Sequence, residues 1–120
     1  MLPDCTMKIL IVDDDKRIRK MLARAISGFA SEVIECGDGG LALKAFEESR
    51  PDCVLMDLKM PGVDGIMATR QIVAAHPNAR IVMVTSYDSP ALREAAHGAG
   101  AKAYILKDDL SELSDTINGL

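Results

Sequence analysis

The fold is decided by residues 53–62, which read CVLMDLKMPG. An unbroken apolar run leads directly into a carboxylate at Asp57, a pattern typical of a strand buried on both faces of a parallel sheet. The Pro61-Gly62 pair that follows is turn chemistry. Asp57 is therefore expected where a central strand ends, at the mouth of a crevice. We interpret it as a nucleophile that accepts a phosphoryl group; the alternative is that it only caps the next turn.

The composition is that of one compact domain. With 120 residues, 48% of them hydrophobic, the chain is long enough for a single core. Charged residues make up 27%, which argues against disorder. A net charge of −4, no Trp, two Tyr and two Phe argue against a nucleic-acid-binding surface on this chain.

The cysteines and the N-terminus indicate where the protein works. Cys5, Cys36 and Cys53 form no CxxC pair, so a thiolate metal site is not expected and reduced thiols suit the cytosol. The N-terminus lacks the charged and apolar parts of a signal peptide. No apolar run approaches the roughly 18 residues of a membrane span. We expect a cytoplasmic protein that does not enter the membrane.

Strand-like and helix-like patterns alternate about five times along the chain. The expected strands are residues 7–12, 32–36, 53–56, 80–84 and 103–106. Two helices are expected from apolar stripes at 18–29 and 41–46, and a third over 64–76. A fourth is expected to begin at Pro90 after a Ser89 cap and to end near Gly98 or Gly100. A last helix is expected after a cap at Asp109 or Ser111. The second strand is more polar and is placed at a sheet edge. This alternation predicts an α/β fold: a doubly wound, five-stranded parallel sheet of order 2-1-3-4-5, flavodoxin-like (βα)5.

Polar side chains stand at the ends of four of these strands. Asp13 and Asp14 follow the first, Asp57 the third, Thr85 the fourth and Lys107 the fifth. If the strand order is 2-1-3-4-5, these side chains converge on one crevice. Singly, each of them has an ordinary explanation as a helix cap, a turn residue or a surface charge. Their shared position at strand ends is what favours a site, and one acid among residues 13–15 is expected to cap the first helix.

Crowded carboxylates require a counter-charge. Two of them about 4 Å apart repel by roughly 4 kcal/mol at an effective dielectric constant of about 20. A proton or a cation must therefore occupy the crevice. The donors are all oxygen, which favours Mg²⁺, with Mn²⁺ possible, over Zn²⁺. Because Mg²⁺ binds phosphate oxygens, phosphoryl transfer is the natural chemistry, with Lys107 and the Thr85 hydroxyl on the remaining oxygens.

This constellation resembles the receiver domain of two-component response regulators, over essentially the whole chain. The resemblance is carried by residues 9–15 (ILIVDDD), 57–65 (DLKMPGVDG), 84–86 (VTS) and 100–107 (GAKAYILK). It implies a signal transduction module rather than an enzyme. Such a module is phosphorylated by a sensor histidine kinase and catalyses only its own phosphorylation and dephosphorylation. It also implies a possible homodimer on phosphorylation.

The resemblance assigns roles by position. Asp57 would be phosphorylated, and Asp14, Asp57 and the backbone carbonyl of Lys59 would hold Mg²⁺, with Asp13 assisting through water. Thr85 and Lys107 would complete the catalytic set. Thr85 would swing toward the phosphoryl group and Tyr104 would turn inward with it. The surface made by the helix from Pro90, the strand 103–106 and the last helix would then change shape.

The chain departs from the common receiver pattern after Lys107. Most receivers have proline there, usually in a cis bond, whereas this chain has Asp108, and whether that bond is cis stays open. Lys-Asp resembles the NarL/FixJ-type branch, whose receivers precede a helix-turn-helix domain that regulates transcription. We expect residues 1–120 to be a receiver alone, excised or stand-alone, that reaches DNA only through a separate output domain.

Two bulky residues stand at positions that tune hydrolysis of the acyl phosphate in this family, Lys59 and Tyr87. We expect them to impede the attacking water; the alternative is that both point to solvent. Two other functions compete with the signalling switch. A Mg²⁺-dependent phosphohydrolase usually carries a second Asp where this chain has Lys59. The third function is a receiver-like scaffold that is never phosphorylated. The presence of all the acidic residues, Asp13, Asp14 and Asp57, argues against it.

Overall fold

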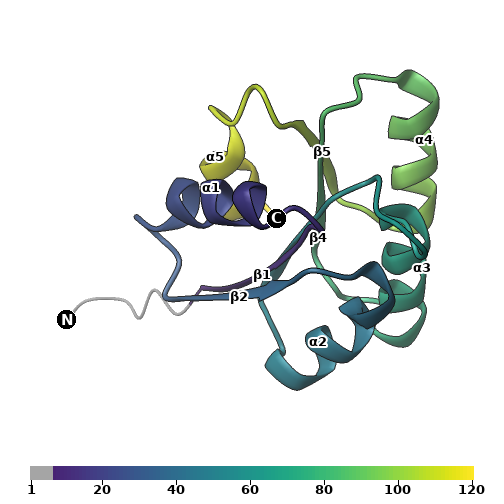
Figure 1. Ribbon diagram of the computed structural model, residues 1–120, viewed down its shortest axis with the longest axis horizontal. Coiled ribbons are helices and arrows are strands. Elements are labelled where there is room, and N and C mark those ends of the chain that lie inside the picture. The colour runs from purple at the N-terminus through teal and green to yellow at the C-terminus, as the bar shows by residue number, and fades with distance from the viewer. Residues whose placement is uncertain (1–6) are drawn as a thin grey trace.

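The structure is a computed structural model that describes residues 7–120, so Cys5 lies outside the described residues (Figure 1). Strands and helices alternate along the chain as predicted. The elements are β1 (Lys8–Val12), α1 (Lys16–Ile26), β2 (Glu32–Cys36), the short 3₁₀ helix η1 (Gly39–Leu41), α2 (Ala42–Ser49), β3 (Cys53–Met56), α3 (Gly65–Ala75), β4 (Ile81–Thr85), α4 (Pro90–Ala99), β5 (Ala103–Leu106) and α5 (Leu113–Asn118). The helices α1, α2, α3 and α4 each lie between two strands that run in the same direction, as in a crossover fold, and α5 follows the last strand.

The five strands form one parallel sheet in the order β2-β1-β3-β4-β5, which confirms the predicted doubly wound architecture. Figure 1 shows α1 and α5 on one face of the sheet and α2, α3 and α4 on the other. Alternate residues of each strand therefore feed two separate cores. Leu10 packs with Phe46 and Ile72 on the three-helix face, while its neighbour Ile9 packs with Leu22 on the two-helix face.

The position of each strand in the sheet follows its composition. All four residues of β3 are buried, as expected for a central strand covered on both faces. Only the last residue of β2 is buried, and the strand lies at the edge, as its polar sequence predicted. Cys53 is buried within β3 as a small apolar residue, also as predicted. No helix of the described residues is long and apolar enough to span a bilayer.

The two middle crossover helices, α3 and α4, both begin after a side-chain N-cap, and the one at Ser89 was predicted. Asp64 accepts a hydrogen bond from the Met67 amide and starts α3, although the helix was predicted to include Asp64 itself. Ser89 accepts a bond from the Leu92 amide and starts α4. Gly100 ends α4 in the left-handed region at φ 114°, which only glycine adopts without strain.

Two helix boundaries were predicted wrongly. The stripe that was extended to Phe29 stops at Ile26, because the Ser27 hydroxyl donates to the Arg24 carbonyl and the chain turns there. The cap expected at Asp109 or Ser111 is absent from α5. The carboxylate of Asp109 instead accepts bonds from the amide and hydroxyl of Ser111, which closes a turn before the helix begins. In both places a local side-chain hydrogen bond stabilises a turn. At Ser27 the turn replaces a longer helix, and at Asp109 it replaces a helix cap.

Candidate functional site

The predicted site residues are carried by backbone that is still bonded into the sheet. The amide of Asp13 donates to Cys36 at 3.0 Å, and that of Asp57 donates to Val12 at 2.8 Å. The amide of Lys107 likewise donates to Thr85 at 2.8 Å. Each residue thus follows its strand by one position at the carboxyl edge. The sequence prediction that these side chains share one edge is confirmed.

The Lys107 ammonium lies between two buried carboxylates. Its Nζ is 2.9 Å from Oδ2 of Asp13 and 3.0 Å from Oδ1 of Asp57. Burial raises the pKa of Asp57 to about 6; the hydrogen bond from Lys107 opposes this shift, and the charge of Asp13 adds to it. Burial by itself would lower the pKa of Lys107, but its bonds to Asp13 and Asp57 outweigh that and leave it raised. The charged form of Lys107 is therefore favoured, whereas burial disfavours the charged form of Asp57.

Three carboxylates lie close enough to share one ion. Ligand oxygens of Asp13, Asp14 and Asp57 all fall within 4.8 Å of one another. Asp15 is the acid that caps a helix, since its Oδ1 accepts the Arg17 amide at 2.8 Å. The one ammonium of Lys107 cannot balance three carboxylates, so the cluster keeps a net negative charge. An all-oxygen donor set of this charge fits a hard divalent cation such as Mg²⁺.

The cleft beside these acids has a volume of about 350 Å³. It is lined by Asp13, Asp14, Asp15, Ile18, Asp57, Lys59, Ser86, Tyr87 and Lys107. At its mouth, Nζ of Lys59 lies 5.2 Å from the centre of the Tyr87 ring, within cation–π range. Both side chains line the cleft, and both are exposed to solvent.

Thr85 and Tyr104 both hydrogen-bond to the backbone of Tyr87, which lines the cleft. Thr85 is fully buried and is not among the residues that line the cleft. Its Oγ1 accepts the Tyr87 amide at 3.1 Å. The Tyr104 hydroxyl donates to the Tyr87 carbonyl at 2.5 Å, and the Arg93 guanidinium covers the Tyr104 ring at 4.5 Å. Tyr104 is half-buried on the edge strand β5.

Two arginines near the site were missed by the sequence analysis. Arg93 is one, and its role on Tyr104 depends on how α4 packs beside β5. Arg19 is the other: its Nη1 donates to the Asp13 carbonyl at 2.7 Å and its Nε donates to Glu35 at 3.0 Å. Arg19 stands four residues after the Asp15 cap and so lies on the same face of the helix. This spacing could have indicated that Arg19 lies near the acidic residues. The Lys107–Asp108 bond, left open before, is trans.

Comparison with known proteins gives matches over most of the chain. A family model described as response regulator receiver domain matches residues 9–118. The transcriptional regulatory protein YhcZ of Bacillus subtilis, itself uncharacterized, is 43% identical over 104 residues, which are 85% of this chain and 49% of YhcZ. The chemotaxis protein CheY of Listeria monocytogenes is 35% identical over 84% of this chain and 86% of CheY. The chain thus spans about half the length of the first relative and most of the second.

Solved structures agree with the fold. A two-component response regulator of the LuxR family from Aurantimonas sp. SI85-9A1 superposes with a TM-score of 0.88 at 36% identity, covering 95% of this chain and 84% of that one. The signal receiver domain of the putative response regulator NarL from Mycobacterium tuberculosis superposes with a TM-score of 0.85 at 28% identity, covering 96% and 98%. The five-stranded sheet and its crossover helices are therefore shared with both.

Proposed function

The chain belongs to the family of response regulator receiver domains, and from this premise we propose that Asp57 accepts a phosphoryl group from a sensor histidine kinase in a Mg²⁺-dependent reaction. The observation that carries the proposal is the Lys107 ammonium within 3.0 Å of the buried carboxylates of both Asp13 and Asp57. The Lys107 ammonium is therefore already positioned to bind an oxygen of the incoming phosphoryl group.

In the proposed reaction an oxygen of Asp57 attacks phosphorus, and the bond from phosphorus to the kinase histidine breaks. Lys107 then binds a phosphoryl oxygen and keeps its contact with Asp13. The carboxylates of Asp13, Asp14 and Asp57 and the carbonyl of Lys59 would hold Mg²⁺, which supplies charge compensation for the phosphoryl oxygens. The product is an acyl phosphate that water later hydrolyses.

The proposed switch uses the bonds on Tyr87. In the structure the Thr85 hydroxyl accepts a hydrogen bond from the Tyr87 amide. When this hydroxyl turns toward the phosphoryl group, that hydrogen bond breaks. The Tyr87 carbonyl is the partner of the Tyr104 hydroxyl, so the Tyr104 side chain is free to turn as the loop moves. Both bonds act on one residue, which couples the phosphorylation site to the α4–β5–α5 surface.

The proposed output is regulation of transcription through a separate helix-turn-helix domain. The printed names of YhcZ, a transcriptional regulatory protein, and of the LuxR-family response regulator support it. A stand-alone signalling receiver is the second candidate, because the chain matches 86% of the length of chemotaxis protein CheY. A phosphohydrolase is disfavoured, since Lys59 stands where such enzymes usually carry an acid-base carboxylate.

Incubation with acetyl phosphate and Mg²⁺ tests the proposal directly. We expect one alkali-labile phosphoryl group per chain, located on Asp57 by peptide mapping after borohydride reduction. Continuous turnover of the donor without bound label would favour a phosphohydrolase. Absence of both label and turnover would leave only a scaffold and would contradict the proposal.

Loss of the Asp14 carboxylate should weaken Mg²⁺ binding by about ten-fold or more, because Mg²⁺ is bound through only one or two carboxylates in such sites. The change is Asp14→Asn, and titration calorimetry with MgCl₂ measures the affinity. Asp15→Asn is the matched control, since Asn also caps helices and the Asp15 carboxylate is occupied by the Arg17 amide. Equal weakening in both variants would mean that the effect is only long-range charge.

Lys59→Asn should speed the loss of phosphate from phosphorylated protein by roughly three- to ten-fold, about 1 kcal/mol of barrier. The shorter side chain ends the contact with the Tyr87 ring and opens the cleft mouth to water. Phosphate release after removal of the donor measures the rate. Lys44→Asn, an exposed change on α2, should leave the rate unaltered. An unchanged or slower loss in Lys59→Asn would contradict the covering role.

A further inference from the structure

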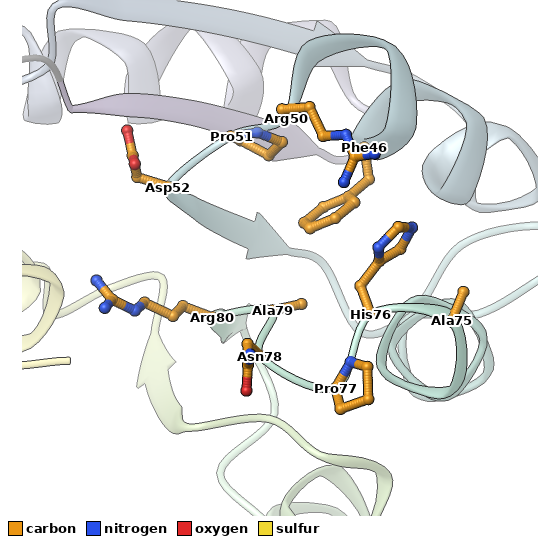
Figure 2. A pocket seen from close by; sticks show the side chains of 10 residues that line it. All are labelled: Phe46, Arg50, Pro51, Asp52, Ala75, His76, Pro77, Asn78, Ala79 and Arg80. Carbon is orange, nitrogen blue, oxygen red and sulfur yellow. The ribbon is translucent and has the colours of Figure 1, made fainter.

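A second hollow opens at the opposite end of the sheet, where β3 and β4 begin (Figure 2). Its volume is about 490 Å³, larger than the cleft beside Asp57 and within the range of small-molecule sites. It is lined by Phe46, Arg50, Pro51, Asp52, Ala75, His76, Pro77, Asn78, Ala79 and Arg80. The four residues of β3, about 3.3 Å each, separate it from Asp57. It is therefore a distinct place from the phosphorylation site.

Two aromatic rings, those of Phe46 and His76, line one side of the hollow. The Phe46 ring is 6% exposed, and its centre lies 5.0 Å from the His76 ring at a tilt of 41°. Nε2 of His76 is 3.0 Å from a carboxylate oxygen of Glu47, which fixes the imidazole. Figure 2 shows the two rings on one side of the hollow, with Pro77 and Ala79 across from them. The exposed part of the His76 ring and the edge of Phe46 offer aromatic surface to a ligand ring.

The charges at the rim favour an anion. Arg50 and Arg80 form no ion pair with any carboxylate in the part of the chain that the structure describes. Asp52 is the one acid that lines the hollow, and its carboxylate accepts the Lys8 amide at 2.7 Å. In Figure 2 that carboxylate points away from the rings, whereas the Arg50 side chain lies beside Phe46. An unpaired guanidinium thus stands next to the Phe46 ring.

The backbone around the hollow is fixed without any ligand. Arg50 ends α2 in the left-handed region at φ 51°, and its amide donates to Phe46 at 2.7 Å. The amide of His76 donates to Ile72 at 2.7 Å, and that of Ala79 donates to His76 at 2.9 Å. A ligand would therefore meet a preformed site and lose little free energy in ordering it.

We propose that this hollow binds a small aromatic carboxylate. Its ring lies against Phe46 and His76, and its carboxylate takes the fork of the Arg50 guanidinium, whose donors match a carboxylate pairwise. Arg80 adds positive charge at the far rim. A purely structural role for Arg50, offsetting the partial negative charge at the C-terminus of α2, requires no ligand. The following experiment separates the two roles.

The probe is 2-naphthoate, titrated into the ¹⁵N-labelled 120-residue chain while amide resonances are followed by NMR. We expect saturable shifts at Arg50, His76 and Ala79 and none at Asp57. The neutral analogue 2-naphthamide should bind about ten-fold more weakly, since a hydrogen bond to a charged group is lost. Acetate, which has the charge without the ring, should give no saturable shift. The proposal would be overturned if 2-naphthoate gave no saturable shifts, or if 2-naphthamide bound as tightly as 2-naphthoate.

The variant Arg50→Gln should weaken 2-naphthoate binding about ten-fold. Arg24→Gln, an exposed change on α1, is the matched control and should bind like the unchanged protein. Arg50→Lys keeps the positive charge but loses the paired donors of the guanidinium, so intermediate affinity is expected. This variant serves as the test if Arg50→Gln folds poorly. Unaltered affinity in folded Arg50→Gln would assign Arg50 the structural role alone and contradict the proposal.

Discussion

Replacing Asp57 with asparagine should abolish phosphorylation and yet raise the free energy of unfolding at pH 7 by about 2 kcal/mol in magnesium-free buffer. Burial raises the pKa of Asp57 to about 6; the bond from Lys107 opposes the shift, and the Asp13 charge adds to it. The ionised carboxylate is thus less favourable in the folded protein than in the unfolded one, where its pKa is about 4. A neutral amide of the same shape removes that cost.

The pH dependence follows from the raised pKa of Asp57. Between about pH 4 and pH 6 the folded protein binds more protons than the unfolded one, so the unchanged protein gains stability as pH falls through this range. The advantage of Asp57→Asn should therefore be full above about pH 7 and absent below about pH 4. Urea unfolding followed by circular dichroism at several pH values measures the difference.

The exposed change Glu94→Gln on α4 is the control for Asp57→Asn, and it should alter the free energy of unfolding by less than about 0.5 kcal/mol. A variant Asp57→Asn that is less stable than the unchanged protein at pH 7 would show that the Lys107 contact outweighs the burial of the carboxylate. Retained alkali-labile label in this variant would place the phosphoryl group on another residue.

Gly65→Ala should lower the free energy of unfolding by about 3 kcal/mol or more, because the site loop has no space for a side chain there. A Cβ at Gly65 would overlap the carbonyl oxygen of Asp57 and lie 2.9 Å from Cα of Leu58. These neighbours are backbone atoms, which cannot rotate away as a flexible side chain would. The Gly65 amide also donates to Leu58 at 2.8 Å, so the loop that carries Asp57 must move. Slower phosphorylation should accompany the lost stability.

Gly98→Ala is the matched control for Gly65→Ala. Gly98 lies inside α4, and a Cβ there would meet no atom within 4 Å. Alanine is the better helix former by about 0.8–1.0 kcal/mol, so this variant should be more stable than the unchanged protein. The two glycine changes should therefore differ in sign in the same urea experiment. Stabilisation by Gly65→Ala would contradict the close contact.

The fold could be predicted from the sequence because its strands are marked by hydrophobicity alone. The run 53–56 is apolar throughout and proved to be a central strand, while the polar run 32–36 proved to be an edge strand. The site followed from the same pattern, since parallel strands bring their polar terminal residues to one edge. Placing Lys107 near Asp57 also required the strand order 2-1-3-4-5, which puts one strand between β3 and β5.

Two kinds of feature could not be predicted: the choice between competing local hydrogen bonds, and contacts between segments distant in the sequence. The turn at Asp109 and Ser111 competes with a helix cap built from the same residue types, so the sequence does not decide between them. The contact of Arg93 with Tyr104 joins α4 to β5 and has no local signal. The hollow beside Phe46 lies where strands begin, and no pattern of residues marks that end of the sheet.

The three amides that follow β1, β3 and β5 are bonded to the neighbouring strands, so the site residues belong to the same cooperative unit as the sheet. Fraying of a surface loop leaves Asp13, Asp57 and Lys107 in place, because their positions change only when strands separate. We therefore expect the geometry around Asp57 to be lost only when strands of the sheet separate.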